Sequence, residues 1–208
     1  MNWKIISKSY GLIGAFLLLF SSCCVNETDS ERLLSNEQAN WVPDSSLTSF
    51  LMESESGVRE SFVLSEFSDT IISFVDDQCG CNVVFQRKWI KYHSTFSSHH
   101  NIEMELNTLN FARLDIGLNW NQQASWDFTN NENIPHAYTS NDYPNPSSMC
   151  FVNRKTINGC AYSKVLTLKF AESDVAENGI IEADFIPKQG IVHYKLRTGI
   201  SYYRKPMP

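Results

Sequence analysis

The chain has 208 residues, of which 42% are hydrophobic and 19% are charged, and its formal net charge is -6 at pH 7. This length suits one domain with a full hydrophobic core, and the composition is neither collagen-like nor that of a disordered chain. The acidic balance argues against nucleic acid as a partner, and no apolar run reaches the roughly 20 residues that a membrane-spanning helix needs.

The first 22 residues have the layout of a secretory signal peptide. Lys4 and Lys8 give a positive start, an apolar run extends from Gly11 to Phe20, and two serines precede Cys23. A positive segment, an apolar segment and small residues at a cleavage site follow one another in such signals. We therefore exclude residues 1–22 from the folded part.

The ending Phe20-Ser21-Ser22-Cys23 resembles the lipobox of bacterial lipoproteins, with Phe20 where the family usually has leucine. The resemblance implies that the signal is cut before Cys23 and that this cysteine carries fatty acyl chains such as palmitate. Each buried methylene contributes about 0.8 kcal/mol, so a multiply acylated cysteine anchors a domain without a spanning helix. An ordinary secretory signal and an uncleaved anchor are the alternatives.

The residue after the lipidated cysteine indicates the destination in lipoprotein families, where Asp at this position favours the inner membrane. Here the position holds Cys24, so the resemblance implies the cell outer membrane. Residues 25–40 are polar and acidic and predict a tether, so residues 23–40 form the lipidated cysteine and its linker. The leaflet, periplasmic or surface-facing, stays open.

Basic residues gather at the end of the chain. Residues 188–208 hold five lysines and arginines and no acid, whereas residues 25–77 are rich in acids. One interpretation is a basic patch for phosphate or lipid headgroups. The interpretation that we favour places the basic final strands beside the acidic early strands of one sheet, where each opposite-charge pair contributes about 0.2–1 kcal/mol.

With Cys23 acylated, five of the six cysteines remain. Cys150 and Cys160 bracket a loop whose closure would stabilise the fold by about 3 kcal/mol, so we expect a disulfide between them. The alternative joins Cys79 and Cys81 crosswise to the same two cysteines. A four-thiolate zinc site is disfavoured, because Cys79 and Cys81 are separated by one residue instead of the usual two. We expect no metal and no cofactor.

Residues 41–208 have the pattern of a single β-rich domain. Residues 47–54 and 58–67 flank a Gly57 turn and predict a hairpin, and apolar alternation predicts further strands at 70–75 and 83–96. Residues 101–128 allow two or three strands or a short helix. At the end of the chain, strict alternation predicts an antiparallel meander over residues 165–170, 181–185, 192–196 and 200–204.

No window of twelve or more residues in the mature chain has helical periodicity with capping signals, so we expect a mostly β fold. The antiparallel meander would form a curved sheet, a half-barrel or a sandwich. The segment Ala183 to Tyr194, a glycine turn and an aromatic strand resemble the C-terminal hairpin of many small bacterial lipoproteins, and Trp41-Val42-Pro43 resembles their opening. This resemblance implies an extended antiparallel sheet and no activity.

The sequence lacks the nucleophile elbow, the zinc-protease helix, the phosphate-binding loop and the dinucleotide fingerprint. We expect His99 and His100 in a solvated turn, and His93 and His193 as ordinary sheet residues. Residues 129–148 form an unusually long loop, rich in amides and aromatic rings that suit a sugar. The contact surface that we predict consists of Trp120, Trp126, Tyr138, Asp142 and Tyr143.

These patterns together predict a lipid-anchored, non-catalytic binding or assembly module of the cell envelope. Its partners would be the membrane, through the anchor, and a glycan or an envelope protein. A carrier for a lipid or acyl chain on a concave sheet is the first alternative. An envelope hydrolase built from scattered Asp, Glu and His residues is the second.

Overall fold

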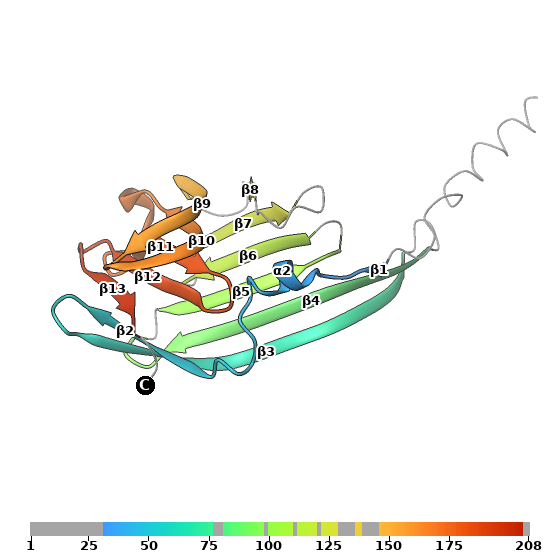
Figure 1. Cartoon of the computed structure of the whole chain (residues 1–208), viewed down its shortest axis with the longest axis horizontal. Helices are drawn as coiled ribbons and strands as arrows, with labels where there is room; N and C mark the ends of the chain where they lie inside the picture. Colours follow the sequence, from blue (N-terminus) through green and yellow to red (C-terminus); the bar gives the residue numbers. More distant parts are fainter. Residues whose placement is uncertain are drawn as a thin grey trace, which may run out of the picture.

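The computed structural model describes residues 31–76, 81–97, 100–109, 112–119, 122–128, 136–138 and 146–205 (Figure 1). No helix in these ranges has the length and apolar character needed to cross a membrane. The elements are β1 (Glu31–Arg32), α2 (Asn36–Ala39), β2 (Ser49–Ser54), β3 (Arg59–Asp76), β4 (Cys81–Ser94), β5 (Asn101–Asn107), β6 (Ala112–Leu118), β7 (Gln122–Phe128), β8 (His136–Tyr138), β9 (Ser148–Ile157), β10 (Cys160–Lys169), η3 (Glu172–Asp174), β11 (Ile180–Ile186), β12 (Gly190–Leu196) and β13 (Ser201–Arg204).

The described strands form one sheet in the order β8-β7-β6-β5-β4-β3-β2-β13-β12-β11-β10-β9, with β1 added to β4. Each strand in this order pairs antiparallel with its neighbours, and the pairing of β2 with β13, in the middle of the order, joins the first part of the chain to its last part. The sheet curls into a half-barrel (Figure 1). The predicted mostly β meander is thus confirmed, as the half-barrel among the three expected shapes.

The observed strands agree with the strands predicted from the sequence in most places. The Gly57 hairpin forms with a positive φ of 81° at that glycine, and the ambiguous segment 101–128 becomes the three strands β5, β6 and β7. Residues 58–67 and 70–75, expected as two strands, are continuous in the 18-residue β3. Residues 31–40, expected within the tether, form β1 and α2 instead, because Ser35 and Gln38 make a capping box.

The core fills the inner face of the curled sheet. Alternate side chains of β5 and β6 are at most 1% exposed, which is the period expected of strands with one buried face. Burying each of these aliphatic side chains contributes about 1.5–3 kcal/mol. The six core side chains of these two strands are Ile102, Met104, Leu106, Leu114, Ile116 and Leu118.

Lys88 on β4 fixes the segment that follows α2 onto this core. Its buried amino group donates hydrogen bonds to the carbonyl oxygens of Ala39 (3.1 Å) and Val42 (2.8 Å). Trp41 lies between these two residues, is 1% exposed, and meets the ring of Phe151 edge-on at 6.2 Å between centroids. The chain that follows the expected tether is therefore part of the folded domain.

The basic end of the chain pairs with acidic residues of an early strand, as we favoured from the sequence. Strand β13 lies beside β2, and the ammonium of Lys205 is 2.9 Å from the Glu53 carboxylate. Arg59 on β3 binds the same carboxylate at 2.8 Å. This part of the basic run is thus matched within the sheet.

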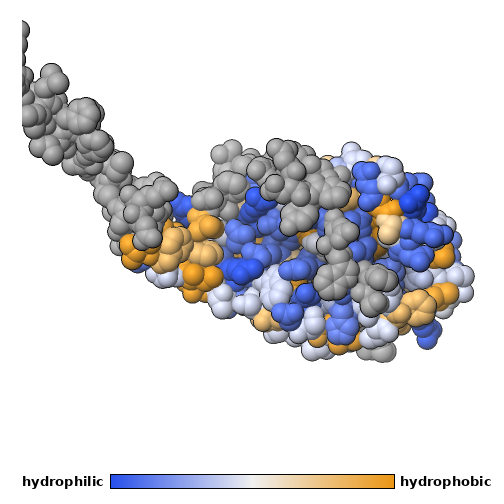
Figure 2. All heavy atoms as spheres, turned by 180° about the vertical axis from the view of Figure 1, so that it is seen from behind, coloured by the Kyte–Doolittle hydropathy of each residue, from blue (hydrophilic) through white to orange (hydrophobic). Residues whose placement is uncertain are grey.

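The hairpin of β3 and β4 extends past the rest of the sheet. Strand β5 pairs with β4 from Arg87 to His93, so residues 71–76 and 81–86 pair with each other and, among the other described strands, with β1 alone. Figure 2 shows apolar side chains gathered at this end of the molecule, whereas hydrophilic ones dominate the body seen from that side.

Candidate functional site

The structure places only part of the predicted contact surface. Trp126 lies on β7, points into the core and is 1% exposed, so the prediction that it contacts a ligand at the surface is wrong. Its neighbours Ala124 and Phe128 share the buried face at period two. Tyr138 contributes the last backbone residue of β8, and its side chain lies outside the described residues, as do Cys23, Trp120, Asp142 and Tyr143.

The expected disulfide between Cys150 and Cys160 does not form. Both thiols are free and exposed. Strands β9 and β10 make a tight hairpin in which Cys160 faces Ile157 while Cys150 faces Thr167, so the two cysteines are separated by about seven residues, or roughly 23 Å, along the strands. Cys79 and the side chain of Cys81 lie outside the described residues. The crosswise alternative would join them to Cys150 and Cys160, and because both of these thiols are free, it does not form either.

A surface cleft of about 430 Å³ opens where the segment around α2 meets β10 and the β11–β12 turn. This volume falls within the range of small-ligand sites. Its lining offers an aromatic ring, amides and ammonium groups, from Glu37, Asn40, Trp41, Ala161, Tyr162, Ser163, Lys164, Ile186, Pro187, Lys188 and Gln189.

The two lysines of the cleft adopt left-handed backbone conformations that residues other than glycine rarely adopt. Lys164 has a φ of 55° within β10, at a position without a paired partner on β9, and Lys188 has a φ of 68° in the turn before β12. Such conformations cost of order 1–3 kcal/mol and persist where the surroundings fix them. Here the Lys188 amide donates to the Asn40 carbonyl at 2.6 Å, and the Lys164 ammonium lies 3.5 Å from Glu37.

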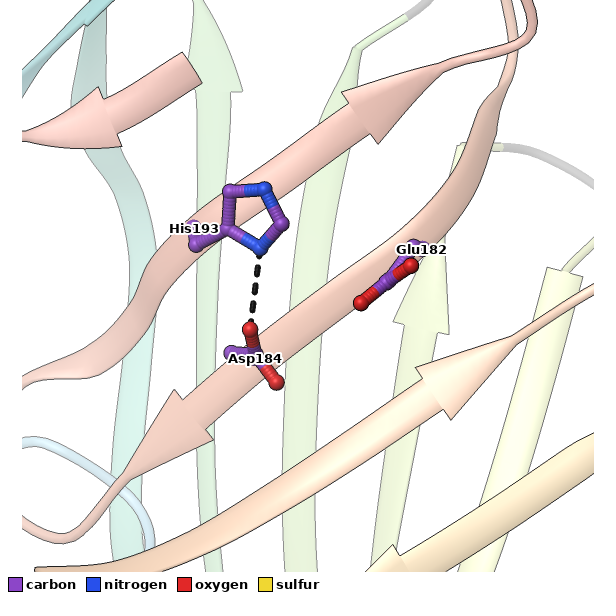
Figure 3. Close-up of side chains that lie close together, drawn as sticks. All are labelled: Glu182, Asp184 and His193. Carbon is purple, nitrogen blue, oxygen red and sulfur yellow. Dashed lines mark hydrogen bonds and ion pairs between the residues drawn. The ribbon is translucent and has the colours of Figure 1, made fainter. Parts of the chain in front are cut away.

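A second polar cluster lies on the outer face of β10, β11 and β12. Asp184, Thr167 and His193 face one another across the three strands and are each less than a tenth exposed. The Asp184 carboxylate accepts hydrogen bonds from Thr167 Oγ1 (2.5 Å), Lys155 Nζ (2.7 Å) and His193 Nδ1 (2.9 Å). Figure 3 shows the imidazole of His193 pointing at this carboxylate, with Glu182 two residues before Asp184 on β11.

This cluster has the residue types of a metal site or of a general base. Ligand atoms of Glu182, Asp184 and His193 lie within 4.8 Å of one another. Burial alone would raise the pKa of Asp184, but the hydrogen bonds from His193, Lys155 and Thr167 outweigh it and hold the pKa below its ordinary value. The Lys155 ammonium supplies the positive charge that a metal ion would otherwise bring, so the cluster is electrostatically matched by the chain itself.

A third cluster is buried inside the sheet around Glu60. His100 donates from Nδ1 to Glu60 Oε1 at 2.8 Å and from Nε2 to the Asn178 carbonyl at 3.0 Å, and Tyr194 donates to Glu60 Oε2. The Asn178 carbonyl can only accept, and the Glu60 carboxylate, whose pKa is lowered, accepts while it is ionised, so in this ion pair both nitrogens of His100 carry hydrogen. His100 is 6% exposed, so the prediction of a solvated turn at this residue is wrong.

No family model matches the chain, and neither a curated protein nor a solved structure matches it significantly. What the site can do chemically is therefore inferred from the geometry of the described residues. Sequence reasoning missed the cleft, because its walls come from three segments far apart in the chain. The Pro187-to-Gly190 turn was visible as a turn signal, but nothing local indicated that α2 lies against it.

Proposed function

We propose that this chain is a lipid-anchored, non-catalytic binding module of the cell envelope, held at the outer membrane by acylated Cys23. The observation that carries the proposal is the signal-like segment that ends at Cys23, followed after a few polar residues by a folded β-domain. Acyl chains on the cysteine supply the membrane affinity, since each buried methylene adds about 0.8 kcal/mol.

Internal pairing of the acid–base clusters supports a role without catalysis. Every oxygen of Asp184 and of Glu60 has a hydrogen-bond donor from the chain, and the donors include a cation at each carboxylate. A general base needs a lone pair aimed at a substrate, whereas both oxygens of each of these carboxylates already accept a hydrogen bond from the chain. Their arrangement suits a structural role within the sheet, and no contact of the described residues favours the hydrolase alternative.

The cleft beside α2 supports a binding role. Tyr162 offers a half-buried ring, Asn40 and Gln189 offer amides, and Lys188 offers an exposed ammonium. An aromatic face, amides and a cation suit a glycan with acidic substituents, because the ring contacts the apolar side of a sugar and the polar groups bind its hydroxyls and carboxylates. The side chains of the concave face pack against one another instead, so a lipid carrier gains no comparable support.

Fractionation of cells tests the anchor. We expect the full chain in the membrane fraction and its Cys23→Ala variant in the soluble extract or unprocessed, with Cys24→Ala as the matched control that stays in the membrane. Equal membrane retention of the Cys23→Ala variant, processed to the same size, would contradict the anchor.

A glycan array tests the cleft. We expect acidic glycans to bind the full chain, and expect Tyr162→Ala and Lys188→Ala each to weaken binding about tenfold, the loss typical of one well-placed contact. Arg59→Ala is the matched control, since Arg59 is an exposed cation at the β2–β3 turn. If neither cleft variant changes glycan binding, the binding site lies outside the cleft.

A further inference from the structure

The end of the β3–β4 hairpin exposes three large apolar side chains. Ile71 is 62% exposed, Val75 60% and Phe74 41%. They lie on the part of β3 that pairs with β4 alone among the described strands. Scattered apolar residues are normal on a surface, but three within five residues give this projecting end an apolar patch.

The patch occupies both faces of the hairpin. Side chains alternate along a strand, so Ile71 and Val75 point to one face and Phe74 to the other. Phe74 meets the ring of Phe85 on the second face at 6.1 Å, edge to face. A protein partner docked on one face would leave the other in water, whereas a lipid surface receives both faces of a projecting end.

The N-terminal strand brings the proposed anchor to the same end. Glu31 and Arg32 in β1 pair in parallel with Val84 and Phe85 of β4, within the projecting part of the hairpin. Cys23 precedes Glu31 by eight residues, which span at most about 29 Å when fully extended. The length of the chain therefore keeps Cys23 within about 29 Å of the Glu31 backbone, which lies on the projecting part of the hairpin.

We propose that the apolar end of the β3–β4 hairpin rests in the headgroup region of the membrane that holds the lipid anchor, and so fixes the orientation of the domain. This inference rests on the proposed function. The rest of the domain then faces away from the membrane, with the β2–β3 and β12–β13 turns farthest from it (Figure 1).

Photo-crosslinking of the intact lipidated chain tests this orientation. The chain is reconstituted in phosphatidylethanolamine–phosphatidylglycerol vesicles that contain a phospholipid with a photoreactive acyl chain, and adducts are mapped after trypsin. Cleavage after Arg59 and Arg87 releases the whole projecting end as peptide 60–87. We expect lipid adducts on this peptide and expect the Ile71→Ser/Val75→Ser double variant to reduce them about tenfold.

The matched control is Ile200→Ser, at the β12–β13 turn, where Ile200 is 43% exposed. This variant is expected to leave the adducts on peptide 60–87 unchanged. All substituted side chains are exposed, so the variants are expected to unfold at the same temperature as the wild-type chain, which circular dichroism checks.

The outcomes separate this inference from the proposed anchor. An acylated Cys23 peptide together with no lipid adduct on peptide 60–87 overturns the hairpin inference and leaves the anchor standing. Lipid adducts on peptide 60–87 of a chain without acyl groups support the hairpin inference while the anchor fails.

Discussion

Glu60 on β3 and His100, the residue before β5, form an ion pair 2.8 Å apart that is almost fully shielded from water. Tyr194 of β12 donates to the other oxygen of the same carboxylate. The carboxylate thus links strands from the first and last thirds of the chain across the interior of the sheet. A buried charge of this kind is tolerated only because each of its oxygens has a donor.

Replacing Glu60 by glutamine is expected to lower the free energy of unfolding by about 3 kcal/mol, because the protonated His100 loses its buried counter-charge. Denaturant unfolding measures this loss. The control is Glu66→Gln, which removes an exposed pair with Lys91 at 3.8 Å and is expected to change stability by less than about 1 kcal/mol. Equal effects of the two substitutions would show that the buried pair contributes no more to the free energy of unfolding than the exposed pair does.

The Glu60–His100 pair predicts that the free energy of unfolding is greatest at an intermediate pH. Burial alone would lower the pKa of His100, but the Glu60 and Asn178 hydrogen bonds raise it above its usual 6.5. His100 therefore contributes stability that is fully present below pH 6.5 and is lost as the pH rises through the raised pKa. Hydrogen bonds likewise overcome burial and hold the pKa of Glu60 below its ordinary value, so its contribution is lost on acidification.

Unfolding free energies measured from acid to alkaline pH test this dependence. We expect the wild-type chain to lose stability above pH 6.5, the ordinary value for histidine, and the His100→Gln variant to be less stable throughout but without that alkaline decline. A variant with the same alkaline decline as the wild type would assign the effect to another group.

Lys155 is predicted to decide whether the outer cluster binds metal. Its ammonium lies 2.7 Å from Asp184, so Zn²⁺ is expected to leave the stability of the wild-type chain unchanged. In Lys155→Ala, the ligand atoms of Glu182, Asp184 and His193 lose the competing cation. Zn²⁺ at a hundredfold excess over its Kd is then expected to stabilise the variant by about 2.7 kcal/mol.

The control for this experiment is the double variant Lys155→Ala/His193→Ala, which lacks one of the three ligands and is expected to gain no stability from Zn²⁺. Thermal unfolding with Zn²⁺ or with a chelator gives the comparison. Stabilisation of the wild-type chain by Zn²⁺ to the same degree would mean that Lys155 does not occupy the position of the ion.

The thiols of Cys150 and Cys160 are predicted to react with a maleimide in the native chain, since both are free and exposed. The double variant Cys150→Ser/Cys160→Ser is expected to unfold at the same temperature as the wild type, with or without reductant. A non-reducing peptide map that joins the two cysteines would contradict the observed hairpin register, because that register separates them by about seven residues along the strands.

The sequence predicted the strands that bury one face, but it did not predict contacts between residues that lie far apart in the chain. Alternation identified β10 to β13, and the same period in Ala124, Trp126 and Phe128 would have placed Trp126 in the core. The Asn158-Gly159 pair, with φ of 46° and 77°, is the turn signal that sets the β9–β10 register and keeps Cys150 from Cys160.

The buried polar clusters had no local signal. His100 follows His99 in a polar stretch, and its partner Glu60 lies forty residues earlier, so only the fold brings the two together. The same holds for the cleft, where Asn40 meets the turn at Lys188. Contacts between residues distant in sequence follow from how the sheet curls, which alternation alone does not specify.

The most direct test of the whole account is the mass of the first peptide of the mature protein, isolated from membranes. We expect this peptide to begin at Cys23 and to carry fatty acyl chains on that residue, while Cys24 carries none. A mature chain that begins elsewhere, or that begins at Cys23 without added acyl mass, would contradict the proposed anchor.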